Sequence, residues 1–252
     1  MGRWLKMDKI MYRSLFLCIL TLIFASCARD VRVSGVSTQA LVVDASVDTI
    51  ADTSYIAYLS AYKCNVEREM AVVIGYAADD MYVGAPECPM LNWATETLWA
   101  CAKEVCPKKV DMAVMNMGGM RCQWQKGPIT QGNVFELMPF DNQLVVLTLK
   151  GEDILALCQS FLTYGAQGVA GLRMTAVDGQ LADVTIGGKP LDVNALYTVA
   201  TSDYLAGGTD HMDALKNHVD YWNSGLLVRD LYVQSVKADT IHAIMDGRMN
   251  IL

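Results

Sequence analysis

Apolar positions along this chain follow two different spacings, which indicates a mixture of helices and strands. In several segments the apolar side chains recur every three or four residues, the spacing of one helix face. These segments are residues 51–67, 89–105, 130–137 and 152–164, with a last helical or strand-then-helix region at 226–239. Pro89 stands near a helix start, where its missing N–H costs nothing, Pro107 ends that helix, and Thr130 is a suitable cap.

Shorter apolar runs between these segments have the length and composition of strands. They cover residues 70–76, 110–115, 143–150, 172–177, 181–186 and 197–201. Met70–Tyr76 is apolar almost throughout, so we expect a buried strand there. Asp178-Gly179 is a strong signal for a hairpin turn between two of the runs. Because helices and strands are mixed and some neighbouring strands are antiparallel, the sequence predicts an α+β fold of layered helices and sheets rather than a doubly wound sheet.

The first 26 residues have the pattern of an export signal. Four basic residues precede the apolar run Leu15–Ala25. That run of about 11 residues is shorter than the ~20 needed to span a bilayer but suits the apolar core of a signal peptide. It ends in Phe24-Ala-Ser-Cys27, which resembles a bacterial lipobox with Cys27 as the acylated residue. An ordinary signal peptide or a buried helix are the alternatives, and Met7 or Met11 are possible starts.

These features predict the domain organisation and the location of the protein. We expect a lipoprotein signal peptide at residues 1–26, a tether at 27–36 and one folded domain at 37–252, since ~100–200 residues per domain is usual. The mature protein would be exported and anchored by lipid to a bacterial membrane, facing the periplasm or the cell surface.

The charge of the chain argues against one class of partner. The formal net charge is −7, and the leader with Asp8 contributes +3, so the mature chain carries −10. An acidic surface repels polyanions, so we expect no nucleic acid polymer as a partner. A single nucleoside or nucleotide in a local pocket remains compatible with this charge.

The cysteines do not show the spacing of a zinc site. Six follow the leader besides Cys27, at positions 64, 88, 101, 106, 122 and 158. None forms a C-x-x-C pair, and a domain of this size does not need disulfides for stability. We interpret them as small core residues, with one disulfide still open.

Three glycine- or proline-containing stretches hold the candidate binding residues. They are Met115-Asn-Met-Gly-Gly-Met-Arg121, Leu137-Met-Pro-Phe140 and Asp203-Tyr-Leu-Ala-Gly-Gly-Thr-Asp210. In the first, the glycines let backbone N–H groups approach a ligand, Asn116 both donates and accepts, and Arg121 offers a fork of donors. A tight turn with Arg121 in a structural salt bridge is the alternative.

The other two stretches each present an aromatic ring. Phe140 follows a proline in a loop, and Tyr204 follows a strand, with Asp210 nearby as an acceptor. Each ring is either packed in the core or exposed for stacking. As a pair they suggest a clamp for a nucleobase, since stacking on one ring is worth roughly 1–3 kcal/mol.

In this order the three stretches resemble the C-terminal, substrate-recognition domain of the bacterial and animal 5'-nucleotidases. The resemblance extends from about Val42 to Leu252 and includes Pro86–Asn92 and Asp246-Gly-Arg248. It implies that the residues holding the nucleoside are Asn116, Gly118, Gly119, Arg121, Phe140, Tyr204 and Asp210.

The chain departs from the family pattern at a few positions. Met117 replaces the first of three glycines, and Thr209 and His211 stand in the usual Gly-Gly-Asp-Gly stretch. Pro86 occupies a place where some members have an extra arginine. These changes would weaken or retune the pocket.

The family's chemistry belongs to a separate N-terminal metallophosphatase domain, for which we find no counterpart in this sequence. The chain has three histidines, His211, His218 and His242, none in a metal-ligand motif, and Ser202, Asp203 and His211 are no convincing triad. We therefore expect no catalytic residue, metal or cofactor in this chain, with divalent metals in a separately encoded partner. The hypotheses are a nucleotide-recognition subunit of a 5'-nucleotidase, a stand-alone nucleoside-binding lipoprotein, and, least favoured, an enzyme.

Overall fold

A computed structural model describes residues 9–24, 32–47 and 52–252 of the chain. Cys27 and the predicted cleavage site lie outside the described residues. Helix α1 (Lys9–Phe24) contains most of the predicted apolar run, and none of the described helices is long and apolar enough to cross a membrane. Residues 32–47 are exposed and contain no α-helix or strand. The compact unit that carries the candidate site is Thr53–Leu252, and the predicted start of the domain at residue 37 stays a prediction.

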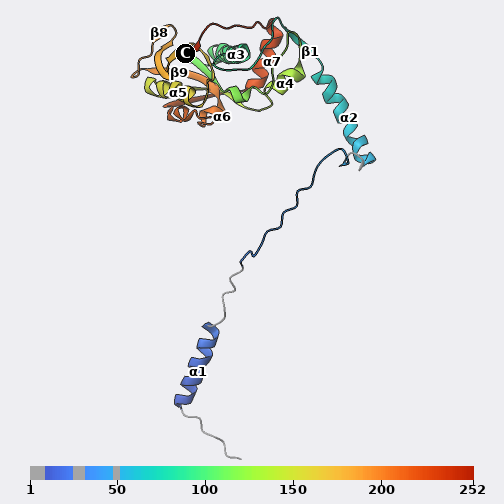
Figure 1. Cartoon of the computed structure of the whole chain (residues 1–252), viewed down its shortest axis with the longest axis vertical. Helices are drawn as coiled ribbons and strands as arrows, with labels where there is room; N and C mark the ends of the chain where they lie inside the picture. The colour runs from blue at the N-terminus through green and yellow to red at the C-terminus, as the bar shows by residue number, and fades with distance from the viewer. Residues whose placement is uncertain (1–8, 25–31, 48–51) are drawn as a thin grey trace, which may run out of the picture. The chain divides into compact units, whose positions relative to one another are not determined.

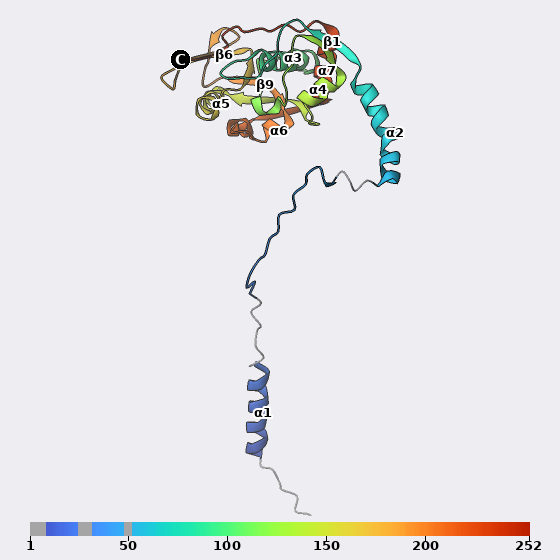
Figure 2. The same cartoon turned by 45° about the vertical axis from the view of Figure 1, so that its right-hand side comes forward.

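A five-stranded sheet forms the centre of this unit. Its strands, in spatial order, are β10 (Asp220–Leu227), β4 (Gln143–Lys150), β9 (Leu196–Ser202), β2 (Met112–Met115) and β5 (Gly168–Ala170). The pair β2–β9 is parallel and the other pairs are antiparallel. Every residue of β2 is buried, as expected for a short apolar strand covered on both faces. Figures 1 and 2 show helix α3 on one side of this sheet and α5 and α6 on the other.

Four helices of this unit begin and end close to the predicted positions: α3 (Pro89–Val105), α4 (Gln131–Leu137), α5 (Gly151–Tyr164) and α7 (Val228–Ala238). The short helix α6 (Asp203–Ala206) and the 3₁₀ turns at Met117–Gly119 and Asp213–Asn217 were not predicted. Pro89 occupies the first turn of α3. Thr130 and Asn133 form a reciprocal capping box at the start of α4, so the predicted cap is confirmed. Ser202 caps α6 by accepting a hydrogen bond from the Leu205 N–H.

Two smaller sheets complete the fold. One has the order β11 (Met249–Ile251), β6 (Leu172–Val177), β7 (Gln180–Ile186) and β8 (Lys189–Pro190), and the other pairs β1 (Val73–Ala77) with β3 (Gly127–Thr130). Asp178 and Gly179, which connect β6 to β7, both have positive φ (50° and 75°), as the predicted hairpin turn requires. The α+β class predicted from the sequence is therefore what the structure has.

Two expectations about burial were wrong or incomplete. The run Met70–Tyr76 is not a buried strand: β1 begins at Val73, and Val73 and Tyr76 are 58% and 46% exposed, because β1 lies in a two-stranded sheet with β3 and outside the central sheet. The predicted helix at 51–67 is α2 (Thr53–Met70), but none of its residues is buried. Its apolar periodicity therefore predicted the helix correctly without indicating a core contact.

Candidate functional site

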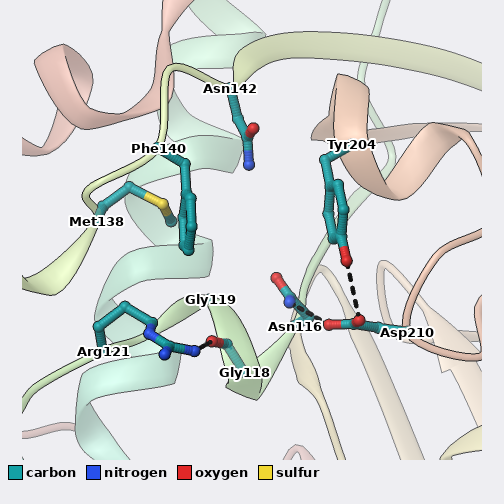
Figure 3. Close-up of a pocket in the computed structure, with 9 residues that line it drawn as sticks. All are labelled: Asn116, Gly118, Gly119, Arg121, Met138, Phe140, Asn142, Tyr204 and Asp210. Atoms are coloured by element: carbon teal, nitrogen blue, oxygen red, sulfur yellow. Dashed lines mark hydrogen bonds between the residues drawn. The ribbon is translucent and has the colours of Figure 1, made fainter. Parts of the chain in front are cut away.

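All seven residues predicted to bind a ligand line one cavity. Its volume is about 280 Å³, near the lower end of the ~300–1,000 Å³ usual for small-molecule sites. The lining residues are Asn116, Gly118, Gly119, Arg121, Met138, Phe140, Asn142, Tyr204 and Asp210, and Figure 3 shows them together. They come from three loops that are far apart in the sequence. The cavity has room for one small molecule rather than for a polymer.

Two aromatic rings form opposite walls of this cavity. Phe140 lies in the loop between α4 and β4, and Tyr204 lies in the first turn of α6. Figure 3 shows the rings on either side of an open space, with their faces directed into it. The two residues are 40% and 46% exposed, so neither ring is packed in the core. A flat ring system inserted between them would contact both faces.

A buried amide and a carboxylate lie at one side of the space between the rings. Asn116 follows β2 and is 6% exposed, and its Nδ2 donates a hydrogen bond to Oδ2 of Asp210. The Tyr204 hydroxyl donates to Oδ1 of the same carboxylate at 3.3 Å. Asn116 and the Tyr204–Asp210 segment meet because β2 and β9 are parallel neighbours, so the segments after them emerge at the same edge of the sheet. The Asn116 amide and the Asp210 carboxylate thus present polar atoms to a ligand in fixed positions.

The glycine loop brings its backbone against Asn116. Residues 117–119 form a 3₁₀ turn, and a Cβ atom on Gly119 would lie 2.7 Å from Oδ1 of Asn116. A side chain at Gly119 would therefore displace the amide that holds Asp210. A Cβ on Gly118 would make only an ordinary contact, 3.5 Å from Oδ2 of Asp210. Only the second glycine is thus required by close approach in the unliganded pocket.

Arg121 is exposed at the mouth of the cavity. Its Nη1 donates to the Gly118 carbonyl at 3.2 Å, and its backbone N–H donates to the Leu137 carbonyl at 3.0 Å. Among residues 52–252, the side-chain hydrogen bond of Arg121 is to the Gly118 carbonyl rather than to a carboxylate. The remaining donors are available for carboxylate, phosphate or hydroxyl oxygens of a ligand.

Comparison with known proteins identifies the family. The family model described as "5'-nucleotidase, C-terminal domain" matches residues 73–217, more than half of the chain. The chain belongs to the 5'-nucleotidase C-terminal domain family. It is similar to the 5'-nucleotidase of Vibrio cholerae, with 32% identity over 137 residues, and to Protein UshA of Escherichia coli, with 33% identity over 132 residues. These matches cover 52% and 49% of this chain but only 25% and 24% of the relatives, so the chain spans about a quarter of their length.

Solved structures agree with this assignment. The 5'-nucleotidase precursor from Thermus thermophilus is 29% identical with a TM-score of 0.70, over 77% of this chain and 42% of that protein. The NAD nucleotidase of Haemophilus influenzae, at 20% identity and a TM-score of 0.61, supports the fold alone; the match covers 100% of this chain and 47% of that protein.

The departures from the family pattern are accommodated by local contacts. Met117 has no positive φ, so its position does not demand glycine, and its N–H donates to Oε1 of Gln167 at 2.6 Å. The Thr209 hydroxyl donates to the Tyr204 carbonyl at 2.7 Å. His211, where the resemblance leads us to expect glycine, adopts the left-handed region, with φ of 62°, and its ring stacks on Tyr164 at 4.0 Å between centroids. The substitution of glycine by His211 is therefore the one that places strain on the backbone.

Sequence reasoning did not single out two residues that line the pocket. Met138 is buried beside Phe140, and Asn142 lies two residues beyond that ring, directed toward the cavity in Figure 3. Both belong to the Leu137–Asn142 segment, whose proline and phenylalanine gave the only sequence signal. The sequence signal that could have indicated Asn142 is a side-chain amide two residues after a phenylalanine in a loop.

The Asp246-Gly-Arg248 segment supports the fold rather than the pocket. Arg248 is 5% exposed. Its Nη1 donates hydrogen bonds to Glu96 Oε1 at 2.8 Å and to the Val169 carbonyl at 3.0 Å. Its Nε donates to Oδ1 of Asp246 at 2.8 Å. Hydrogen bonds from this guanidinium hold the pKa of the Asp246 carboxyl below its usual range, against the opposing effect of burial. These contacts tie the C-terminal strand to α3 and β5.

The described residues do not fit a dinuclear metal centre. In residues 9–24, 32–47 and 52–252 no group of three or more His, Cys, Asp or Glu side chains is arranged to hold a metal ion. The pocket itself offers one carboxylate, that of Asp210, which is already engaged by Asn116 and Tyr204. No disulfide joins the cysteines at positions 64, 88, 101, 106, 122 and 158, and burial raises the pKa of the Cys158 thiol to about 12.

Proposed function

We propose that the cavity binds a nucleoside or nucleotide, with the base held between Phe140 and Tyr204. The observation that carries the proposal is the pair of exposed rings facing each other beside the buried amide of Asn116 and the exposed carboxylate of Asp210. The rings supply stacking surface, and Asn116 and Asp210 supply a donor and an acceptor for sugar hydroxyls or a base edge. Arg121 lies where a cation can reach ribose or phosphate oxygens. The family membership supports this assignment of roles.

We further propose that the protein acts as the recognition component of a 5'-nucleotidase. The metal-dependent phosphatase domain would be a separately encoded chain that supplies divalent metals and the activated water. The match to the family's C-terminal domain supports the recognition role. The resulting assembly would dephosphorylate nucleotides at the outer side of a bacterial membrane, to which Cys27 would attach the protein through lipid. A stand-alone nucleoside-binding lipoprotein is the second candidate.

Calorimetric titration of the purified protein tests the binding proposal. Adenosine and AMP should bind saturably, whereas ribose 5-phosphate, which lacks a base, should bind much more weakly. Equal affinity for ribose 5-phosphate and AMP would show that the rings do not hold the base. Absence of binding by both adenosine and AMP would reject the proposal.

Affinity purification of the tagged protein from its own membranes separates the two candidate functions. A metallophosphatase chain that co-purifies, and AMP hydrolysis by the eluate that a chelator removes, are expected for the recognition subunit. Nucleoside binding without such a partner would favour the stand-alone lipoprotein.

A further inference from the structure

We propose that Arg229 is a positioning residue that holds the Phe140 wall of the pocket in place. Arg229 is the second residue of α7 and lies beyond residues 73–217, which match the family model. It does not line the cavity, so it would act on a ligand only through the loop that carries Phe140 and Asn142. This inference rests on the proposed function. The experiments below distinguish a failure of the proposed function from a failure of the inference.

Two consecutive residues of α7 bind three consecutive residues of the loop. Nη1 of Arg229 donates to the Phe140 carbonyl at 3.3 Å, and Nη2 donates to Oδ1 of Asp141 at 2.6 Å. The backbone N–H of Val228 donates to the Asn142 carbonyl at 2.9 Å. The backbone that follows the Phe140 side chain is thus held against the start of one helix.

The guanidinium of Arg229 is itself held in one orientation. Its side chain is only 11% exposed, and its carbon Cζ lies 4.5 Å from the centre of the Phe135 ring. Its Nε is buried and has no hydrogen-bond partner in the described residues. Leaving a buried donor unpaired is unfavourable. The side chain nevertheless keeps this orientation, in which its two terminal nitrogens bind the loop. Asp141 is 77% exposed, and an ordinary surface ion pair with it would not require a buried arginine. The burial of the Arg229 side chain therefore indicates a role beyond a surface ion pair.

The loop needs an anchor of this kind because its aromatic ring has little packing of its own. Phe140 is 40% exposed, and its neighbours Pro139 and Asp141 are both exposed as well. A planar fork of donors reaches a carbonyl and a carboxylate at once, which a lysine ammonium cannot do with the same geometry. Arg229 therefore sets the position of the ring relative to Tyr204 before a ligand arrives, which reduces the ordering cost of binding.

Arg229→Met tests the inference, because methionine keeps an unbranched chain and removes every donor. We expect adenosine to bind about tenfold more weakly, and by no more than Phe140→Ala causes, since stacking on one ring contributes roughly ten- to a hundredfold. Arg229→Lys, which keeps the charge, should fold like wild type and show an intermediate loss. The matched control is Arg173→Met, which removes an exposed arginine paired with Asp246 away from the pocket. It should leave adenosine affinity unchanged.

A double-mutant cycle with Phe140→Ala separates positioning from general destabilisation. If Arg229 acts through the ring, R229M should cost little further affinity in the F140A background. Full additivity of the two losses, or wild-type affinity in both R229M and R229K, would overturn the inference.

Amide hydrogen exchange without ligand supplies a second measurement that does not depend on nucleoside binding. R229M should raise exchange across residues 140–142 and leave α6 unchanged. Unchanged exchange in the loop would refute the positioning role, even if the wild type binds adenosine. If the wild type binds no nucleoside but the loop still loosens in R229M, the proposed function fails and the anchoring role stands.

Discussion

Truncation of either ring of the cavity should separate binding from stability. Phe140→Ala and Tyr204→Ala each remove a side chain from a residue that is 40% or 46% exposed. A fully buried phenylalanine loses ~3–5 kcal/mol of folding free energy when truncated to alanine. Because nearly half of each residue is already in contact with water, we expect a cost of about 1–2 kcal/mol, well within the ~5–15 kcal/mol of a typical domain.

The effect on binding should be larger than the effect on folding. Stacking of a base on one aromatic ring contributes roughly 1–3 kcal/mol, so each variant should lose about ten- to a hundredfold in affinity for adenosine or AMP. Tyr204→Phe keeps the ring but removes the hydroxyl that donates to Asp210 at 3.3 Å. It should retain most of the affinity, which distinguishes stacking from hydrogen bonding.

Two control variants calibrate this experiment. Phe161→Ala, at a core residue of α5 that is 2% exposed, should lower the melting temperature clearly. Tyr221→Ala, at a residue of β10 that is 45% exposed, should affect neither adenosine affinity nor stability by much. Calorimetric titration and thermal unfolding of the same samples provide both quantities. If F140A and Y204A unfold like the Phe161 variant, or bind adenosine like wild type, the rings do not form a clamp.

Three further predictions concern the backbone strain, the chemistry and the anchor. H211G should be more stable than H211A by ~0.5–1 kcal/mol in urea unfolding. Both variants lose the stack on Tyr164, but only glycine adopts the left-handed φ without strain. The reverse order of stability would contradict strain at this position. The purified chain alone should release no phosphate from AMP with Mn²⁺, Mg²⁺ or Zn²⁺, and metal-dependent release by the chain would revive its assignment as an enzyme. Cys27→Ala should move the protein from the membrane pellet to the soluble fraction, and retention in the pellet would argue for an uncleaved apolar anchor.

The longer helices and the central strands β2, β4 and β9 were predictable because their signals are local, whereas β10 in the same sheet was not predicted. The periodicity of α3 and α5, the Thr130 cap and the Asp178-Gly179 turn each depend on neighbouring residues and appear in the structure as expected. The short strands β3, β5 and β11 were not predicted. Each has three or four residues and depends on a partner strand far away in the sequence. A segment of that length is too short to show a period of its own.

Seven of the nine residues that line the pocket were predictable from family motifs, but their mutual geometry was not. No spacing in the sequence indicates that Asn116 donates to Asp210, 94 positions further along the chain, or that the two rings face each other. Arg229 carries no motif at all, and its role is visible only from its contacts with Phe140 and Asp141. Sequence patterns thus identified seven residues that line the cavity and missed a residue that we infer acts through them.

The strand register explains why the two rings meet. β4 and β9 are antiparallel, with Leu144 opposite Ser202, so the loop before β4 and the helix after β9 lie at the same edge of the sheet. Phe140 is four residues before that pair and Tyr204 two residues after it. The Gln143 N–H donates to Oδ1 of Asp203 at 3.1 Å, which joins the two segments directly. The sheet therefore brings the two walls together, whereas the Ser202 cap and the Arg229 contacts fix the local backbone from which each ring projects. Because these two anchors act on different walls, loss of either should impair binding of the base without disturbing the sheet.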